Sequence, residues 1–445
     1  MADKDVDAGA KAEDEDEGEA EGEADGKGEA DGKGEADGKG EADGKGEADG
    51  KGEGEADGEA EGKADPQRAD AQRPGVQQAV VVQVGSGRLR AGFAGDDTTR
   101  VDFPLIVGRA RNTGIHVGMG HKLVYIGDEA VSKRGVLTLT YPIDRGRVVD
   151  WDGIEKALNH TLVNELRAAS AEHAILLAIS PIAPAADREQ YARILFEVLA
   201  VPALYIASTA VLSLNASART TGLVLDLDEG TGAAVPIYEG HTLPHAVSTL
   251  DVAPREVTDT FIKLLGPRGE PFVSTGGRMV ARDIMEKLAY VALDYGDAMA
   301  KSGTAPKRPY TMPDGSVLEF GSELFGCTEI LFQPQLAGHA GPGIHQLIHA
   351  AIQKCDAEIR ADLYGGVVLS GSPTLFPGMA ERLQKELAAL APPGTAVKVH
   401  APPGRHRSAW VGGSMLAALK TFEPMWITAA AYRKDGAAVI RRQLF

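Results

Sequence analysis

The chain has 445 residues, of which 43% are hydrophobic, and this exceeds what one small core needs and predicts two or more lobes. Its two cysteines exclude a disulfide framework and a cysteine-based metal cluster. The formal net charge is −18 at pH 7, but residues 1–78 hold 27 acidic and 10 basic side chains, so the remaining body is nearly neutral. The sequence of this body shows no large basic patch, and we therefore expect no nucleic-acid binding.

The N-terminal segment contains five tandem copies of Gly-Glu-Ala-Asp-Gly-Lys at 22–51. These repeats have no aromatic or β-branched residue, so nothing offsets the entropy lost on ordering, and we expect disorder over 1–78. We interpret this segment as a solvating tail, with an acidic tether for a basic partner as the alternative. Because the acidic start has no apolar stretch, we expect no signal peptide and no membrane segment.

The body, from Ala79, opens with a strand, a glycine turn and a returning strand, "AVVVQVGSGRLRAGFAG". The same pattern recurs about 140 residues later as "GLVLDLDEGTGAAVPIYEG". Backbone amides in such turns can bind anions, and the two candidate turns are Gly85-Ser86-Gly87 and Gly230-Thr231-Gly232. A nucleotide held between them would close a cleft between two lobes. Taken separately, each is also explained by an ordinary hairpin turn.

The segment 151–167, "WDGIEKALNHTLVNELR", predicts an amphipathic helix. Ile154, Leu158, Leu162 and Leu166 share its inner face, and Asp152 is the predicted N-cap.

Two further segments also predict helices. A third strand and turn, "GGVVLSGSPTLFPGM", leads into a helix with Pro377 in its first turn and Leu383, Leu387 and Leu390 on one face. The longest apolar segment, at 201–218, predicts a buried helix. Strands mixed with helices in this way indicate an α/β protein.

Several long segments of the body are similar to actin, and they follow one another in the same order. They are "AGFAGDD" (91–97), "GMGHK" (118–122), "YIGDEAVSKRGVLTL" (125–139), "ARDIMEKLAYVALD" (281–294), "KCDAEIRADLY" (354–364) and "WVGGSMLAALKTF" (410–422). The resemblance extends from Ala79 to Phe445, and the acidic tail is additional.

The resemblance implies an α/β, actin-like two-lobed fold with duplicated five-stranded mixed sheets, ribonuclease H-like, around an interlobe nucleotide cleft. It implies the following division: a tail at 1–78, a first lobe at 79–216 completed by 408–445 with a small subdomain at 105–141, and a second lobe at 217–407 with a small subdomain at 253–339.

The departures from actin fall on its chemical machinery. Gln83 stands where actin has an acid that helps to hold the hydrated cation, whereas the partner acid is retained as Asp226. Mg²⁺ prefers charged oxygen ligands, so a neutral amide weakens that site. Thr209 replaces the glutamine that positions water, and Ala233 replaces an assisting histidine. Losing the positioned water alone costs about a hundredfold in rate.

The region that contacts adenosine and phosphate in actin has changed as well. Met279 and Met285 replace a glutamate and a lysine, Arg282 is retained, and His406 replaces another lysine. Asp228 adds a carboxylate where actin has a small residue, and this charge would repel phosphates.

ATP or ADP with Mg²⁺ is the cofactor that the resemblance implies. The positions at which it would be held are Gly85, Ser86, Gly87, Arg90, Asp226, Gly230, Arg282 and Gly371. We assign no catalytic residue and no protein metal ligand, and we expect little or no ATP hydrolysis.

The resemblance also implies surfaces for partners. Segments 112–122 and 332–345 match filament contacts. An apolar groove for actin or actin-binding proteins would be lined by Ala216, Thr220, Met415, Leu416, Leu419 and Met425. Self-assembly is left open.

We therefore interpret the chain as an actin-like cytoskeletal or scaffold protein of the cytoplasm, which binds protein partners and has a degraded nucleotide site. A functional ATP-binding filament protein is the alternative. An actin-related subunit of a nuclear complex is a further alternative.

Overall fold

The computed structural model describes residues 77–111 and 122–442. The predictions for the tail and for the filament loop at 112–122 therefore lie almost wholly outside the described residues. Strand β1 begins at Gln77, two residues before the predicted start of the body. Within the described ranges, no helix combines the length and the apolar character needed to cross a lipid bilayer.

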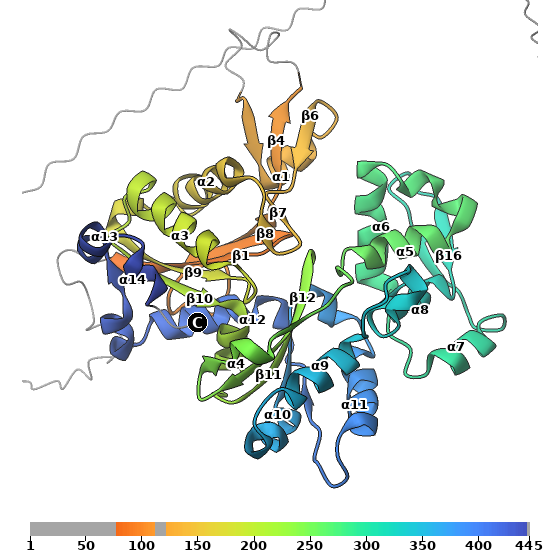
Figure 1. The fold of residues 1–445 in the computed structure, drawn as a ribbon. Coiled ribbons are helices and arrows are strands. Elements are labelled where there is room, and N and C mark those ends of the chain that lie inside the picture. The colour runs from red at the N-terminus through yellow and green to blue at the C-terminus, as the bar shows by residue number, and fades with distance from the viewer. Residues whose placement is uncertain (1–76, 112–121, 443–445) are drawn as a thin grey trace, which may run out of the picture. The chain divides into compact units, whose positions relative to one another are not determined.

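The first sheet has the strand order β19-β10-β9-β1-β2-β3 (Figure 1). Strand β1 pairs antiparallel with β2 and parallel with β9, and β9 pairs parallel with β10. The strands are β1 (Gln77–Val84), β2 (Arg88–Phe93), β3 (Val101–Pro104), β9 (His173–Ile179), β10 (Ala203–Ser208) and β19 (Ile427–Thr428).

The second sheet repeats these pairings in the order β13-β12-β11-β17-β18, with β14 added on β12. Strand β11 is antiparallel to β12 and parallel to β17, and β17 is parallel to β18. The strands are β11 (Gly222–Asp228), β12 (Thr231–Tyr238), β13 (His241–Thr242), β14 (Ser248–Thr249), β17 (Val367–Ser370) and β18 (Val399–His400). The predicted duplication is confirmed, and each sheet carries one further short strand, β19 or β14.

Helices pack against the large sheets and also form much of the smaller subdomains (Figure 1). They are α1 (Gly127–Ser132), α2 (Trp151–Asn159), α3 (Ala185–Arg193), α4 (Thr209–Ala216), α5 (Glu256–Leu264), α6 (Thr275–Leu288), α7 (Tyr295–Lys301), α8 (Glu323–Gly326), α9 (Ile344–Gln353), α10 (Arg360–Gly365), α11 (Met379–Leu390), α12 (Ser408–Ala417), α13 (Ala429–Asp435) and α14 (Ala438–Arg441). The segment Val80–Val82 of β1 is a continuous apolar run, because its side chains are buried in cores on both faces of the sheet.

Smaller sheets complete the body. Strands β4 (Val107–Ala110), β5 (Val124–Ile126) and β6 (Leu137–Thr140) form a three-stranded sheet that packs with α1. Two hairpins are formed by β7 (Ile143–Asp144) with β8 (Arg147–Val148), and by β15 (Arg308–Thr311) with β16 (Val317–Phe320).

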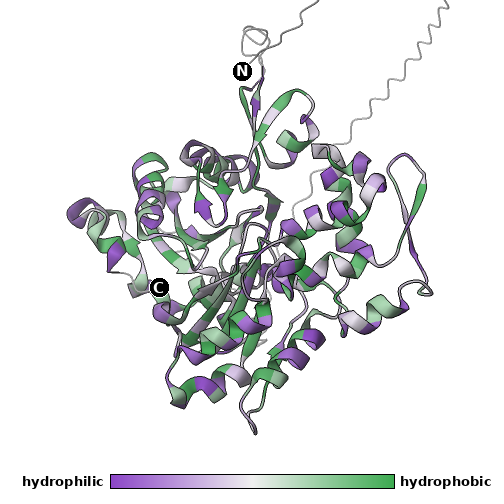
Figure 2. Cartoon of the chain, turned by 45° about the vertical axis from the view of Figure 1, so that its right-hand side comes forward, coloured by the Kyte–Doolittle hydropathy of each residue, from purple (hydrophilic) through white to green (hydrophobic). Residues whose placement is uncertain are grey.

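Strand alternation divides the apolar side chains among separate cores. Val80 and Val82 of β1 join the core that contains Ile154 of α2, whereas Val81 joins the core that contains Trp410 of α12. The Trp410 indole nitrogen also donates to the Val81 carbonyl at 3.1 Å. Figure 2 shows the apolar residues concentrated on the strands.

The apolar segment 201–218 is a strand followed by a helix, β10 and α4, and the prediction of one buried helix was wrong. Its first half lies beside β9 as a buried parallel strand, and a short apolar run does not by itself distinguish such a strand from a helix.

Two helix starts also differ from their predictions. The N-cap of α2 is Asp150, which is extended and accepts from the Gly153 amide at 2.9 Å, whereas Asp152 lies in the first turn. Ile154, Leu158 and Leu162 are buried as predicted, but a π-helical segment, His160–Glu165, follows α2 and leaves Leu166 half-buried.

Helix α11 begins after Gly378, which has a φ of 84°, so Pro377 precedes the helix instead of lying in its first turn. Leu383 and Leu387 are fully buried as predicted, whereas Leu390 in the last turn is 37% exposed.

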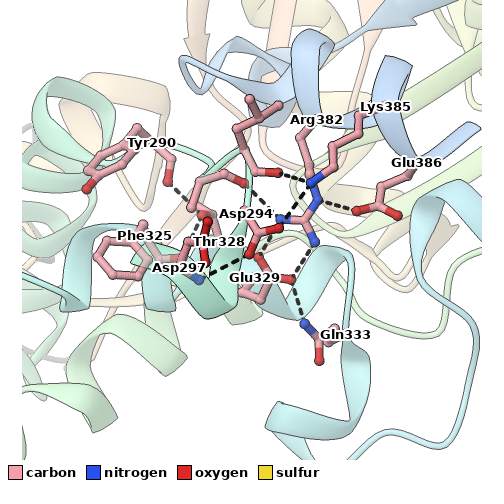
Figure 3. A network of polar contacts seen from close by, with 12 residues as sticks. Tyr290, Asp294, Asp297, Phe325, Thr328, Glu329, Gln333, Arg382, Lys385 and Glu386 are labelled. Atoms are coloured by element: carbon pink, nitrogen blue, oxygen red, sulfur yellow. Dashed lines mark hydrogen bonds and ion pairs between the residues drawn. The ribbon is translucent and has the colours of Figure 1, made fainter. Parts of the chain in front are cut away.

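A buried ion pair joins α11 to the chain around Glu329 (Figure 3). Glu329 is completely buried, and its carboxylate accepts from Arg382 at 3.1 Å and from Gln333 at 2.8 Å. The Arg382 guanidinium also donates to Glu386 at 2.6 Å and to the Ala292 carbonyl at 2.8 Å. Each buried charge therefore has several partners.

Replacing Glu329 with alanine would leave the Arg382 cation buried with fewer partners. We expect Glu329→Ala to lower the free energy of unfolding by about 3 kcal/mol in urea titrations. Lys385→Ala removes the exposed ion pair with Asp294 and should cost less than about 1 kcal/mol. Equal losses in the two variants would contradict this assignment.

Candidate functional site

Two hairpin turns face each other at the carboxyl ends of β1 and β11. Gly230 of the β11–β12 turn lies so close to Ser86 that an added Cβ would be 2.9 Å from the Ser86 side chain. A cavity of about 40 Å³ lies between the hairpins, against the roughly 300–1,000 Å³ of typical ligand sites. Its polar lining includes Gln83, Ser86, Arg90, Thr209, Asp226, Asp228, Ser370 and His406.

A carboxylate of the second hairpin lies on the first glycine turn. The Asp228 carboxylate accepts from the Ser86 backbone amide, and its Oδ2 atom also accepts from the Ser86 hydroxyl at 2.6 Å. The Gly85 amide is used within the turn, where it donates to the Arg88 carbonyl at 3.0 Å. The Ser86 amide, which could otherwise donate to an external anion, thus already donates to the Asp228 carboxylate.

The path of β11 explains why Asp228 points this way. Successive side chains of a strand alternate between the two faces, so Asp226 and Asp228 share one face while Leu227 occupies the other. Leu227 is fully buried in the core of the second sheet. Asp228 is the last residue of β11 and pairs with Thr231, so its side chain projects at the strand end toward Ser86.

The next residue, Glu229, provides a second carboxylate. It forms an ion pair with Arg282 of α6, and its side chain lies against Gly87, where an added Cβ would overlap the carboxylate. Arg282 was the retained nucleotide-contacting cation in the prediction. In the structure its charge is neutralised by a neighbour from the turn itself.

A second cavity, of about 300 Å³, lies beside the first. Its lining includes Arg88, Arg90, Asp102, Glu229, Arg255, Arg282, Met285, Glu286, Phe376 and His406.

Each of the four arginines in this lining is paired with a carboxylate of the chain. Arg88 contacts Asp102 at 2.6 Å, and Arg90 contacts the same carboxylate at 3.2 Å. Arg255 contacts Asp144 at 2.6 Å, and Arg282 pairs with Glu229.

The pair Gln83 and Asp226 occupies the corner at which the resemblance implies a cation. The Gln83 Oε1 atom is buried and has no hydrogen-bond partner among the described residues. The Asp226 carboxylate accepts from the Thr209 hydroxyl at 2.6 Å and from the Ser370 hydroxyl at 2.8 Å. Burial raises the pKa of Asp226, the charge of Asp228 raises it further, and the two hydroxyl donors oppose the shift. The side-chain donors to this carboxylate are therefore two neutral hydroxyls.

Buried hydroxyls continue from this corner into the interior. The Ser370 hydroxyl lies 2.9 Å from that of Ser213, which lies 3.0 Å from that of Ser408. These serines come from β17, α4 and α12, so one polar chain joins elements of both sheets.

Six of the eight predicted contact residues line the two cavities. Gly85, Ser86, Asp226 and Gly371 line the small cavity, Arg282 lines the larger one, and Arg90 lines both.

Gly87 lies in the first turn against Glu229, and Gly230 lies in the second turn against Ser86, whereas Thr231 and Gly232 belong to β12. Gly371 has a φ of 93°, and an added Cβ would overlap the Leu227 carbonyl.

The sequence interpretation missed the internal partners of these cations. Asp102 stands opposite Arg90 in the register of β2 and β3, which the sequence alone could have suggested once both strands were assigned. The ion pair of Glu229 with Arg282 spans two elements and had no sequence signal. His406, in place of a lysine, has a pKa lowered first by burial and then by Arg90, so its ring is neutral at pH 7.

The chain matches the family model described as Actin over residues 75–445. It therefore belongs to the actin family. The fold agrees with this assignment, because the two large sheets share the same strand pairings.

The residues at this site do not fit the ATP and Mg²⁺ that the family binds. The Ser86 amide already donates to a carboxylate, and each arginine that lines the larger cavity is paired with a carboxylate of the chain. A triphosphate would meet these carboxylates at close range, and like charges repel.

Substitution of Asp226 tests whether this part of the site binds a cation. We expect the free energy of unfolding of Asp226→Asn at pH 7 to be at least as large as that of the wild type, because the amide still accepts from a hydroxyl and burial disfavours the charged acid. Added Mg²⁺ should not alter that difference in thermal or urea unfolding.

The pH dependence of the same variant has a definite sign. Since the folded-state pKa of Asp226 is raised, its contribution to stability is present below the ordinary value of 3.8 and is lost as the pH rises through the folded pKa. The Asn variant should therefore gain on the wild type with rising pH across that window. A gain of the wild type over the variant would contradict the assignment.

Proposed function

We propose that this chain is an actin-like scaffold component of the cytoplasmic cytoskeleton that binds protein partners and hydrolyses little or no ATP. The contact of Asp228 with Ser86 carries the proposal, because it puts a fixed negative charge where a phosphate would have to bind.

The positions implied for catalysis support the same conclusion. The Thr209 hydroxyl donates its proton to Asp226, so it is not free to donate to a water molecule. Ala233 is buried in β12 and has only a methyl side chain. A positioned general base within hydrogen-bond reach is what water activation requires. Because Gln83 is neutral, the side chains at these three positions supply neither a base for proton transfer nor a negative charge for a metal ion.

An apolar surface supports the partner-binding part of the proposal. Met415 of α12, Leu419 and Met425 are each 52% exposed, and α12 packs on α4, which ends at Ala216. Leu416 is half-buried beside them, and Thr220 is exposed. Exposed apolar side chains that cluster in this way are typical of interaction surfaces, and a helical segment of an actin-binding protein is the partner we propose.

Nucleotide binding tests the first part directly. We expect calorimetry of the full chain with Mg·ATP to give no binding tighter than about 1 mM, because the anion site is filled by a carboxylate. No phosphate release above background should follow. Conventional actin in the same buffer is the positive control. Micromolar affinity with phosphate release would overturn the proposal in favour of a filament ATPase.

The apolar surface is tested by fluorescence anisotropy with a labelled amphipathic helix from an actin-binding protein. Met415→Asp should weaken binding at least about tenfold, since a charge would be buried under the peptide. Val136→Asp, at a residue 66% exposed in another subdomain, is the matched control and should bind as the wild type does. Equal affinities for all three proteins would refute the assigned surface.

A further inference from the structure

The carboxylates of Asp228 and Glu229 can accept from the same donors as the phosphates of a nucleotide. A carboxylate and a phosphate are both oxyanions that accept from backbone amides and hydroxyls, and charge-assisted bonds of this kind are shorter and stronger than neutral ones. Asp228 makes two such contacts with Ser86, across 142 residues of sequence.

Glu229 extends the same arrangement by one residue. Its carboxylate pairs with Arg282 and lies against the Gly87 backbone, so two consecutive anions meet the turn and the retained cation. The Glu229 backbone is fixed as well, because its carbonyl accepts from the Arg255 amide at 2.8 Å. Arg255 in turn reaches Asp144 of β7 at 2.6 Å.

The backbone at position 228 is held at the end of strand β11. Its Cα is paired with Thr231, and its neighbours in the chain are the buried Leu227 and Glu229, whose carboxylate pairs with Arg282. The Gly85 backbone also lies close to the carboxylate, since an added Cβ at 85 would be 3.1 Å from Asp228 Oδ2. The glycine turn therefore surrounds the carboxylate closely.

We propose that Asp228 and Glu229 form a built-in anion lock, in which the chain's own carboxylates replace the phosphates of a nucleotide and hold the two hairpins together without a ligand. This inference rests on the proposed function, because it supplies the reason why no nucleotide is needed to join the sheets. The lock is lost when the Asp228 carboxylate is lost, and the freed amide and hydroxyl of Ser86 then become a site for an external oxyanion.

The test uses thermal unfolding of the full chain with inorganic pyrophosphate, without Mg²⁺ or adenosine. Asp228→Gly should unfold a few degrees lower than the wild type, about 2–4 °C. Pyrophosphate at 5 mM should recover at least half of that loss, whereas the wild type should shift by less than about 1 °C, because an anion stabilises only the form that binds it.

Two further variants make the result specific. Asp228→Asn keeps an acceptor for Ser86 but removes the charge, so it should show a smaller loss and a smaller pyrophosphate response. Asp362→Asn removes an exposed charge of α10 and should behave as the wild type. If Asp228→Gly does not fold, the comparison of Asp228→Asn with Asp362→Asn decides.

The lock is refuted if the Asp228 variants unfold at the wild-type temperature, or if pyrophosphate shifts them no more than it shifts Asp362→Asn. The lock stands, and the partner-binding part of the proposed function falls, if the wild type does not bind the labelled amphipathic helix while Asp228→Gly still shows the loss and its recovery. The proposed function stands alone if the wild type ignores Mg·ATP and the Asp228 variants show neither effect.

Discussion

The contact between the Asp228 carboxylate and the Ser86 amide and hydroxyl is the constraint on which the site depends. A hydrogen bond to a charged group contributes about 1.5–3 kcal/mol, and this one joins hairpins that belong to different sheets. It also determines what else the turn can do. Once the Ser86 amide is used, an incoming phosphate has to displace a carboxylate that is tethered beside it.

The duplicated fold places that contact. Each sheet ends its central strand at a tight turn, and the two turns meet because β1 and β11 have the same pairings in their own sheets. Within the actin family this geometry serves a nucleotide and its cation. Here the same geometry brings together Asp228, Glu229 and paired arginines, so the family's fold is combined with anions and cations that are paired within the chain.

The sequence was informative where residues are apolar and periodic or where a motif is collinear with actin. The hairpins, the buried Val80–Val82 run and the inner face of α2 follow from such patterns and are present. The sequence patterns did not decide between local alternatives of similar strength. Asp150 caps α2 in place of Asp152, and segment 201–218 divides into β10 and α4. Side-chain pairs between distant elements leave no periodic signal, so the partners of Ser86 and Arg282 could not be derived.

A crystal structure of the full chain grown with Mg·ATP tests the central claim most directly. The account predicts Asp228 Oδ2 within about 3 Å of the Ser86 amide and hydroxyl, with no triphosphate density on the Gly85–Gly87 turn. Density for a triphosphate on those amides, with the Asp228 side chain turned away, would contradict it.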